Sequence, residues 1–184
     1  ASFLADQPAA FGTVNEDYVK RELDWYKSQS LNVNDIPPPI PAIWQKVATP
    51  DGLINSNYGY LMYSANNGSQ FSNVVSALLD HRETRRAVAI YTRPSMHTDF
   101  NVDGMSDFIC TNAVSYVIRD NKVHAVVQMR SNDLIFGYRN DYFWQAHVLA
   151  EVTACYNGCM SSLKRPFERV DVGAITWQVS SLHV

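Results

Sequence analysis

Two strand-like stretches joined by a short polar turn constrain the fold of this chain more than any other feature. Residues 113–118 and 123–129 are rich in strand-forming residues, and Asp120-Asn121 lies between them. Turns of this composition join antiparallel strands, so we expect a tight hairpin. Two further stretches of strand-forming residues, 87–91 and 174–179, extend the predicted sheet.

Helical patterns are intermixed with these strands. Asn15 suits the N-cap of a helix over residues 16–29, because the acidic residues after it favour the first helical turn. We expect two more helices over residues 69–79 and 142–154. The proline-rich residues 36–41 must be extended, since proline lacks the N–H donor that a helix needs. Helices mixed with antiparallel strands predict the α+β class.

Length and charge restrict the classes of function. A chain of 184 residues is read as a single domain, residues 1–184. The net charge of −3 and the pI near 5.9 give no broad basic surface, so we expect no direct contact with nucleic acid and none with a membrane. No apolar run approaches the roughly 20 residues that span a bilayer. Three cysteines, an odd number, make no disulfide framework and favour a reducing cytoplasm.

One group of motifs points to chemistry. Cys110 is followed after twenty residues by Arg130, and then by Gly137 and Asp141. A thiol reacts as its thiolate, and a nearby arginine can lower the thiol pKa while its planar fork binds phosphate. The glycine allows close approach of a ligand, whose edge the carboxyl can read. The group therefore predicts covalent catalysis on a phosphorylated planar substrate, whereas Cys110 alone would more often be a buried structural thiol.

The order of motifs resembles the thymidylate synthase superfamily, and within it the branch of deoxycytidylate (dCMP) hydroxymethylases from large bacteriophages. The resemblance covers nearly the whole chain, through residues 20–26, 43–45, 55–59, 84–86, 91–96, 107–112, 130–141 and 181–183. It implies a mixed β-sheet flanked by helices, with two sheets packed back to back in a homodimer. Because relatives carry sequence beyond both ends, we expect the single domain to lack segments at both ends.

The resemblance assigns the reacting groups. Cys110 would add to carbon 6 of the pyrimidine and make carbon 5 nucleophilic, which divides one hard step into easier ones. 5,10-methylenetetrahydrofolate would be the co-substrate that carries the one-carbon unit. Glu22 would organise water and move protons, and we expect burial to raise its pKa to a useful value. Tyr58 matches a tyrosine that lies near the thiol.

Binding residues are implied in the same way. Arg130 and Ser131 match residues that hold the nucleotide phosphate, and His183 matches a histidine that holds the sugar hydroxyl. Arg85 and Arg86 match paired arginines that reach across a dimer to the partner's phosphate, although adjacent arginines near a helix end are in general solvated or capping charges.

The folate side is assigned to Trp44, Asp133 and Gly137, with Trp44 left open between a folate contact and plain core. Cys155 and Cys159 stand four residues apart near the expected end of a helix. Two ligands do not make a zinc site, so we interpret both thiols as structural and expect no metal.

Asp141 decides the base. Thymidylate synthases have asparagine here, because a carboxamide accepts from uracil N3–H and donates to its carbonyl. Cytosine has the opposite order, which a protonated aspartic acid satisfies by donating to the ring nitrogen and accepting from the amino group. An ionised aspartate could instead pair with a protonated ring. Asn140 is adjacent, and a shift of one residue would return the uracil assignment.

These assignments predict a folate-dependent dCMP 5-hydroxymethyltransferase, in which water completes the reaction. The alternatives are a thymidylate synthase or related pyrimidine-nucleotide methyltransferase, and a non-catalytic nucleotide-binding scaffold. The expected partners are dCMP, folate and a second copy of the chain. Recruitment by other nucleotide-synthesis enzymes stays open. The expected location is the cytoplasm, that of an infected bacterial host if a phage encodes the protein.

Overall fold

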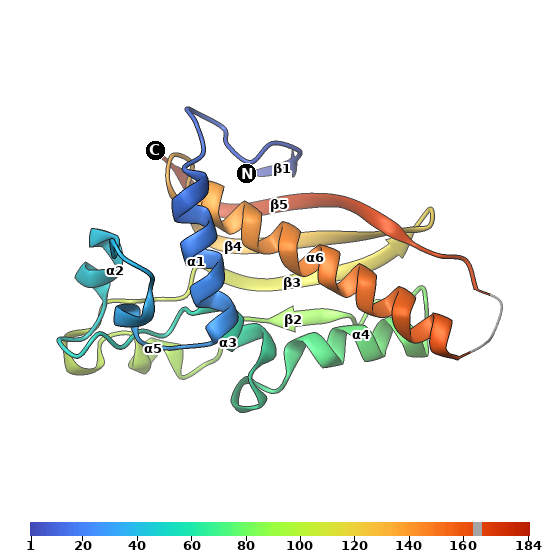
Figure 1. Cartoon of the computed structure of the whole chain (residues 1–184), viewed down its shortest axis with the longest axis horizontal. Coiled ribbons are helices and arrows are strands. Elements are labelled where there is room, and N and C mark those ends of the chain that lie inside the picture. Colours follow the sequence, from blue (N-terminus) through green and yellow to red (C-terminus); the bar gives the residue numbers. More distant parts are fainter. Residues whose placement is uncertain (164–166) are drawn as a thin grey trace.

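A five-stranded mixed sheet forms the centre of the molecule in the computed structural model, which describes residues 1–163 and 167–184 (Figure 1). The strand order is β1-β5-β4-β3-β2. The strands are β1 (Ser2–Ala5), β2 (Val88–Ile90), β3 (Thr111–Arg119), β4 (Lys122–Asp133) and β5 (Asp171–His183). The predicted α+β class is therefore confirmed, and so are the four predicted strands.

The predicted hairpin is the β3–β4 pair. Arg119 pairs with Lys122, so that two residues make the turn. Asp120 and Asn121 have φ values of 49° and 56°. Positive φ at both central residues gives a turn whose twist matches that of the flanking strands, and Asp and Asn tolerate this conformation better than most residues. The turn therefore fixes the register that brings Cys110, just before β3, next to Arg130 on β4.

β4 and β5 run parallel and are connected by the long helix α6 (Gly137–Ser162). Parallel neighbours need a crossover of this kind. With α1 (Glu16–Ser28) and α4 (Gln70–Asp80), α6 covers one face of the sheet (Figure 1). The first two predicted helices match α1 and α4, and the Asn15 side chain accepts from the backbone N–H of Tyr18 at 3.0 Å, as expected of an N-cap.

The third predicted helix, residues 142–154, was too short at both ends. Asp133 precedes α6, and its Oδ1 accepts from the backbone N–H groups of Ile135, Phe136 and Gly137, the first residue of the helix, at 2.8, 2.6 and 3.4 Å. Tyr138 and Tyr156, outside the predicted range, are buried against the core. This packing extends the helix through residues of modest helix propensity.

Several short elements were not predicted. They are β1 and the helices α2 (Ala42–Val47), α3 (Tyr58–Tyr63) and α5 (Met96–Asp99). Each is too short for a periodic pattern to reveal it. The proline-rich stretch has extended backbone at both its ends, Ile36 and Pro41, and Pro41 is the N-cap of α2.

Aromatic packing joins the helices to one another. Trp144 of α6 lies between Tyr26 of α1 and Tyr91, with its ring 5.3 Å from that of Tyr26 and its Nε1 donating to the Tyr91 hydroxyl at 3.1 Å. Tyr58 of α3 stacks on Tyr26 at 5.3 Å. Large buried aromatics contribute much of a core's free energy. They hold α1, α3 and α6 in one packed unit, which fixes the positions of three side chains of the site.

Candidate active site

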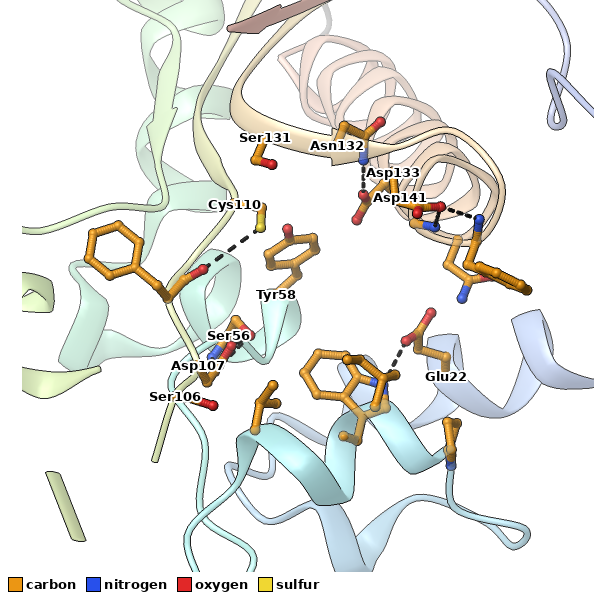
Figure 2. A pocket seen from close by; sticks show the side chains of 18 of the residues that line it. Glu22, Ser56, Tyr58, Ser106, Asp107, Cys110, Ser131, Asn132, Asp133 and Asp141 are labelled. Atoms are coloured by element: carbon orange, nitrogen blue, oxygen red, sulfur yellow. Dashed lines mark hydrogen bonds between the residues drawn. The ribbon is translucent and has the colours of Figure 1, made fainter. Parts of the chain in front are cut away.

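A cavity of about 850 Å³ lies where α1, α2 and α3 face the segment before β3, the end of β4 and the start of α6 (Figure 2). This volume is within the range of small-molecule sites. Ten of the twelve site residues predicted from the sequence line it: Glu22, Trp44, Tyr58, Cys110, Arg130, Ser131, Asp133, Gly137, Asp141 and His183. These residues are far apart in the sequence, and the fold brings them to one cavity.

Cys110 is held beside Arg130. The arginine Nη2 lies 3.4 Å from the Cys110 Sγ and donates to the Phe108 carbonyl at 2.6 Å, while Nε donates to the Ile109 carbonyl at 2.9 Å. Burial raises the pKa of the Cys110 thiol to about 11, although the Arg130 charge lowers it. The expected effect of Arg130 on the thiol pKa is present, but burial outweighs it, so the resting group is a thiol.

Tyr58 and Thr111 complete the wall behind Cys110. The Thr111 Oγ1 donates to the Tyr58 hydroxyl oxygen at 3.0 Å, and both side chains are buried. Burial raises the pKa of Tyr58 well above its ordinary value. The tyrosine lies beside the thiol, as expected (Figure 2). Its hydroxyl is therefore neutral and can still donate a hydrogen bond into the cavity.

Glu22 is a buried carboxyl with 4% of its surface exposed. Its Oε1 accepts from the Tyr18 hydroxyl at 2.7 Å and from Trp44 Nε1 at 3.0 Å. Burial raises the pKa of Glu22 to about 7, although both hydrogen bonds act in the opposite direction. The expectation that burial raises this pKa is confirmed. A carboxyl that titrates near neutral pH can both give and take a proton.

Asp141 lies on the first turns of α6 and is bonded to Asn132, whose Nδ2 donates to the Asp141 Oδ2 at 2.7 Å (Figure 2). Burial and the nearby Glu22 charge raise the pKa of Asp141 to about 8, while the Asn132 bond lowers it. At neutral pH the carboxyl is therefore mostly protonated and can donate a hydrogen bond. The adjacent Asn140 lines the same cavity.

The three residues expected on the folate side have different surroundings. Trp44 packs edge-on against Trp25 at 5.0 Å, and it also lines the cavity and donates to Glu22, so it serves both the core and the site. Partial burial acts to raise the pKa of Asp133, but the backbone N–H groups of residues 135–137 that donate to its carboxylate hold the pKa below its usual value. Gly137 begins α6 against Asn132 and Asp133.

The phosphate and sugar residues lie partly outside this arrangement. Ser131 on β4 and His183 at the end of β5 line the cavity. Arg85 and Arg86 do not: they are exposed on the connection between α4 and β2. The described residues of one chain therefore do not bring the paired arginines to the thiol.

Sequence reasoning missed several polar residues of the cavity wall, among them Asn132, Tyr18, Asp107 and Ser56. Asn132 holds Asp141, and Tyr18 holds Glu22. The buried Asp107 accepts from the backbone N–H groups of Asn55 and Ser56, at 2.7 and 2.8 Å, and from the Ser56 hydroxyl. This carboxylate ties the segment that precedes Tyr58 to the segment that precedes Cys110. Asn132 and Asp107 lie inside the motifs already identified, which was the available signal.

The described residues contain no group of three or more His, Cys, Asp or Glu side chains placed to hold a metal ion. Cys155 and Cys159 lie near the C-terminal end of α6, as expected. Burial and the neighbouring Cys159 raise the pKa of Cys155. None of the helices in the described part of the chain is long and apolar enough to cross a bilayer.

Comparison with known proteins places this arrangement in a family. The Thymidylate synthase family pattern matches residues 12–163. The chain is 51% identical over all 184 residues to the deoxycytidylate 5-hydroxymethyltransferase of Enterobacteria phage T6, of which it covers 73%.

Two solved structures share the fold. Thymidylate synthase A of Bacillus subtilis aligns with a TM-score of 0.66 at 18% identity, and thymidylate synthase of phage T4 aligns with 0.71 at 14% identity. Each alignment covers 97% of this chain but only 62% and 64% of the respective structures. The family pattern and the phage relative together settle the classification: this chain belongs to the thymidylate synthase family.

Proposed function

We propose that this chain is a deoxycytidylate 5-hydroxymethyltransferase, which transfers a one-carbon unit from 5,10-methylenetetrahydrofolate to carbon 5 of dCMP and lets water complete the reaction. The proposal draws on the phage relative of that name. The observation that carries it is the Asp141 carboxyl, which faces the cavity with a pKa of about 8. A protonated carboxyl has the donor and acceptor that cytosine requires, and with its proton on the oxygen that faces the ring nitrogen it would oppose the N3–H donor of uracil with a second donor.

Cys110 is the proposed nucleophile. Its sulfur bonds to carbon 6 of the pyrimidine, and carbon 5 becomes nucleophilic. Because the pKa of the resting thiol is about 11, the thiol must lose its proton as the substrate binds. The Arg130 guanidinium, 3.4 Å away, favours the negative sulfur.

Arg130 is also the proposed phosphate ligand, together with Ser131. Its Nε and Nη2 are bonded to the segment before β3, but its Nη1 makes no hydrogen bond within residues 1–163 and 167–184. Two N–H groups therefore remain for the substrate. The same guanidinium can hold the phosphate and stabilise the thiolate.

Glu22 is the proposed proton carrier. With a pKa of about 7, its carboxyl is present in both forms at neutral pH. Tyr18 and Trp44 hold its Oε1 from one side, which leaves the other oxygen for a water or for the base. Tyr58, on the opposite side of the cavity, keeps a neutral hydroxyl beside the reacting sulfur.

The cavity walls fit a folate as the second substrate, which supplies the one-carbon unit when bound. Ile43 and Phe136 line the cavity with 59% and 72% of their surfaces exposed. Exposed apolar side chains at a cavity mouth mark a surface for an aromatic ligand. Trp44, Asp133 and Gly137 line the same cavity, and they are the proposed folate contacts.

We further propose that the enzyme is a homodimer formed through the uncovered face of the sheet. Residues on this face, among them Gln128 and Gln178, are exposed and bonded to each other at 3.4 Å. Arg85 and Arg86 would complete the partner's phosphate site, while His183 would hold the sugar hydroxyl of the nucleotide. The proposed place of action is the cytoplasm of an infected bacterium.

The test is to incubate the protein with methylenetetrahydrofolate and dCMP or dUMP, each carrying tritium at carbon 5. We expect tritium release from dCMP and a product that mass spectrometry identifies as 5-hydroxymethyl-dCMP. Release from dUMP with a methylated product would instead identify a thymidylate synthase. Binding of dCMP without release would identify a nucleotide-binding scaffold.

A further inference from the structure

Asn132 and Asp141 form a buried pair at the junction of β4 and α6. Asn132 has 4% of its surface exposed, and its Nδ2 donates to the Asp141 Oδ2 at 2.7 Å (Figure 2). A Cβ on Gly137 would lie 3.5 Å from the Asn132 Nδ2 and 3.8 Å from the Asp141 Oδ2. The start of the helix therefore packs directly over this bond and shields it from solvent.

The other oxygen of each group is unpaired within the described residues. The Asn132 Oδ1 is buried without a hydrogen-bond partner. The Asp141 Oδ1 accepts no hydrogen bond from the described residues either, and Asp141 lines the cavity. The pair is thus joined at one oxygen of the carboxyl, and the second oxygen is left for a ligand.

We propose that Asn132 is a positioning residue for base selection, because its amide holds the Asp141 Oδ2 as an acceptor and so leaves the Asp141 proton on the cavity-facing Oδ1. This inference rests on the proposed function. Oδ1–H then donates to the ring nitrogen of cytosine, and Oδ2 accepts from its amino group through its second lone pair.

The reason lies in the hydrogen-bond inventory. A protonated carboxyl has one carbonyl oxygen and one hydroxyl oxygen. An amide N–H donates more readily to the carbonyl oxygen than to the hydroxyl oxygen, which carries the proton. If the amide were reversed, Asn132 Oδ1 would instead accept a proton held on Oδ2, and the cavity-facing oxygen would repel the cytosine ring nitrogen. The two amide orientations therefore predict opposite effects when Asn132 is removed.

The other titratable groups near Asp141 cannot replace Asn132. They are Glu22 and Tyr26 of α1, Tyr58 of α3, Tyr91 after β2, and Cys110 before β3. Each is an acid that is neutral or negative, and the pKa values of the phenols and the thiol are raised, so none brings a positive charge. Among the described residues, Asn132 is the group whose side chain hydrogen bonds to this carboxyl.

The first experiment measures kcat/KM for dCMP against pH in the wild type and in Asn132→Ala. Binding of cytosine needs protonated Asp141, so the rate falls as pH rises through the pKa of that carboxyl. Loss of the Asn132 bond raises this pKa, because the bond lowers it. We therefore expect kcat/KM at its optimum pH to fall about tenfold. The alkaline limb, which is the part of the pH profile where kcat/KM decreases with rising pH, should move to higher pH.

General damage to the fold would lower kcat/KM without moving the alkaline limb of the pH profile to higher pH. Asn140→Ala is the matched control, because Asn140 lines the cavity beside Asp141 but has no hydrogen bond to it among the described contacts; its alkaline limb should stay in place. If Asn132→Ala does not fold, Asn132→Leu, whose side chain has a similar branched shape, also lacks the donor and adds no charge, so it should show the same upward movement. A limb that stays in place in the folded variant, or moves down, overturns the inference.

A second experiment uses Asp141→Asn as the background. There the new carboxamide shifts the preference toward dUMP, but Asn132 opposes part of that shift, because its Nδ2 attracts the carbonyl of the carboxamide and so favours the order that suits cytosine. Adding Asn132→Ala should therefore raise the ratio of kcat/KM for dUMP to that for dCMP by several-fold over Asp141→Asn alone. An unchanged ratio overturns the inference. If the wild type fails to release tritium from dCMP, the proposed function fails instead, so the two failures are distinguishable.

Discussion

The two walls of the cavity hold their polar groups by different means. On the sheet side, Arg130 is bonded to two backbone carbonyls and lies against the Cys110 sulfur, whose pKa is about 11. On the helix side, Glu22 and Asp141 are held by neutral side chains, and their pKa values are about 7 and 8.

The two walls therefore have different tasks: the sheet side fixes the positions of its groups, and the helix side holds the groups whose protonation changes. The strand ladder and the carbonyl bonds fix the sheet-side groups, and near neutral pH the resting thiol does not change its charge. The helix-side carboxyls are the groups whose protonation changes in that range. We therefore expect the sheet side to set whether the reaction occurs, and the helix side to set its pH dependence and its choice of base.

The largest effect is expected on the sheet side. Cys110→Ala should abolish turnover, because no other thiol lines the cavity among the described residues, while binding of dCMP should largely persist through phosphate and base contacts. Tritium release and calorimetric titration with dCMP measure the two properties. Cys159→Ala, on α6 outside the cavity, is the matched control. Substantial turnover by the Cys110 variant would exclude the covalent mechanism.

Glu22→Gln tests the helix side. The amide oxygen can still accept from Tyr18 and Trp44, but it cannot carry protons, so kcat should fall by about 100-fold or more. Stability should change in the opposite direction. In the wild type the folded state keeps a proton on Glu22 that the unfolded state loses, so stability falls as pH rises from about 4.5 to about 7.

The Gln variant has no such loss. Its free energy of unfolding should therefore exceed that of the wild type by on the order of 3 kcal/mol at pH 8, and by little at pH 4. Urea unfolding at both pH values measures this. Glu16→Gln is the control, since Glu16 is exposed in the first turn of α1. Equal differences at the two pH values would show that burial does not disfavour the charged form of Glu22.

Asp141→Asn sharpens the role of the helix side in base choice. The carboxamide can adopt the order that uracil requires, so the preference should shift from dCMP toward dUMP by about tenfold or more. The alkaline limb that Asp141 causes should also disappear, because an amide does not titrate. The ratio of kcat/KM for the two nucleotides, measured across pH, is the readout. An unchanged ratio would show that Asp141 does not select cytosine.

The smallest effect tests whether a partner subunit contributes residues to the cavity. If Arg86 acts across a dimer, an Arg86→Ala subunit mixed with a Cys110→Ala subunit should regain on the order of a quarter of wild-type activity, because half of the dimers are hybrids with one intact site. Each variant measured alone should have little activity. No recovery, with subunit exchange verified independently, would mean that Arg86 acts within its own subunit or only structurally.

Local sequence patterns were enough to predict the elements that depend only on neighbouring residues. Asp120-Asn121 predicted a two-residue turn because these residues tolerate positive φ, and Asn15 predicted a cap because its side chain can accept from the first turn. The motif around Cys110 predicted a nucleophile with an arginine beside it. The resemblance to a family, carried by ordered motifs, supplied the other roles.

Tertiary structure decided what depends on surroundings. Residues 137–141 and 155–162 are helical because Tyr138 and Tyr156 pack on the core, a contact that no local pattern contains. The sequence places a carboxyl at positions 22 and 141, but only burial, together with the nearby Glu22 charge in the case of Asp141, brings their pKa values near neutrality. The bond from Asn132 to Asp141 likewise depends on how β4 meets α6. Residue types determine which groups are available, whereas protonation and pairing follow from dielectric surroundings and geometry, which exist only in the folded chain.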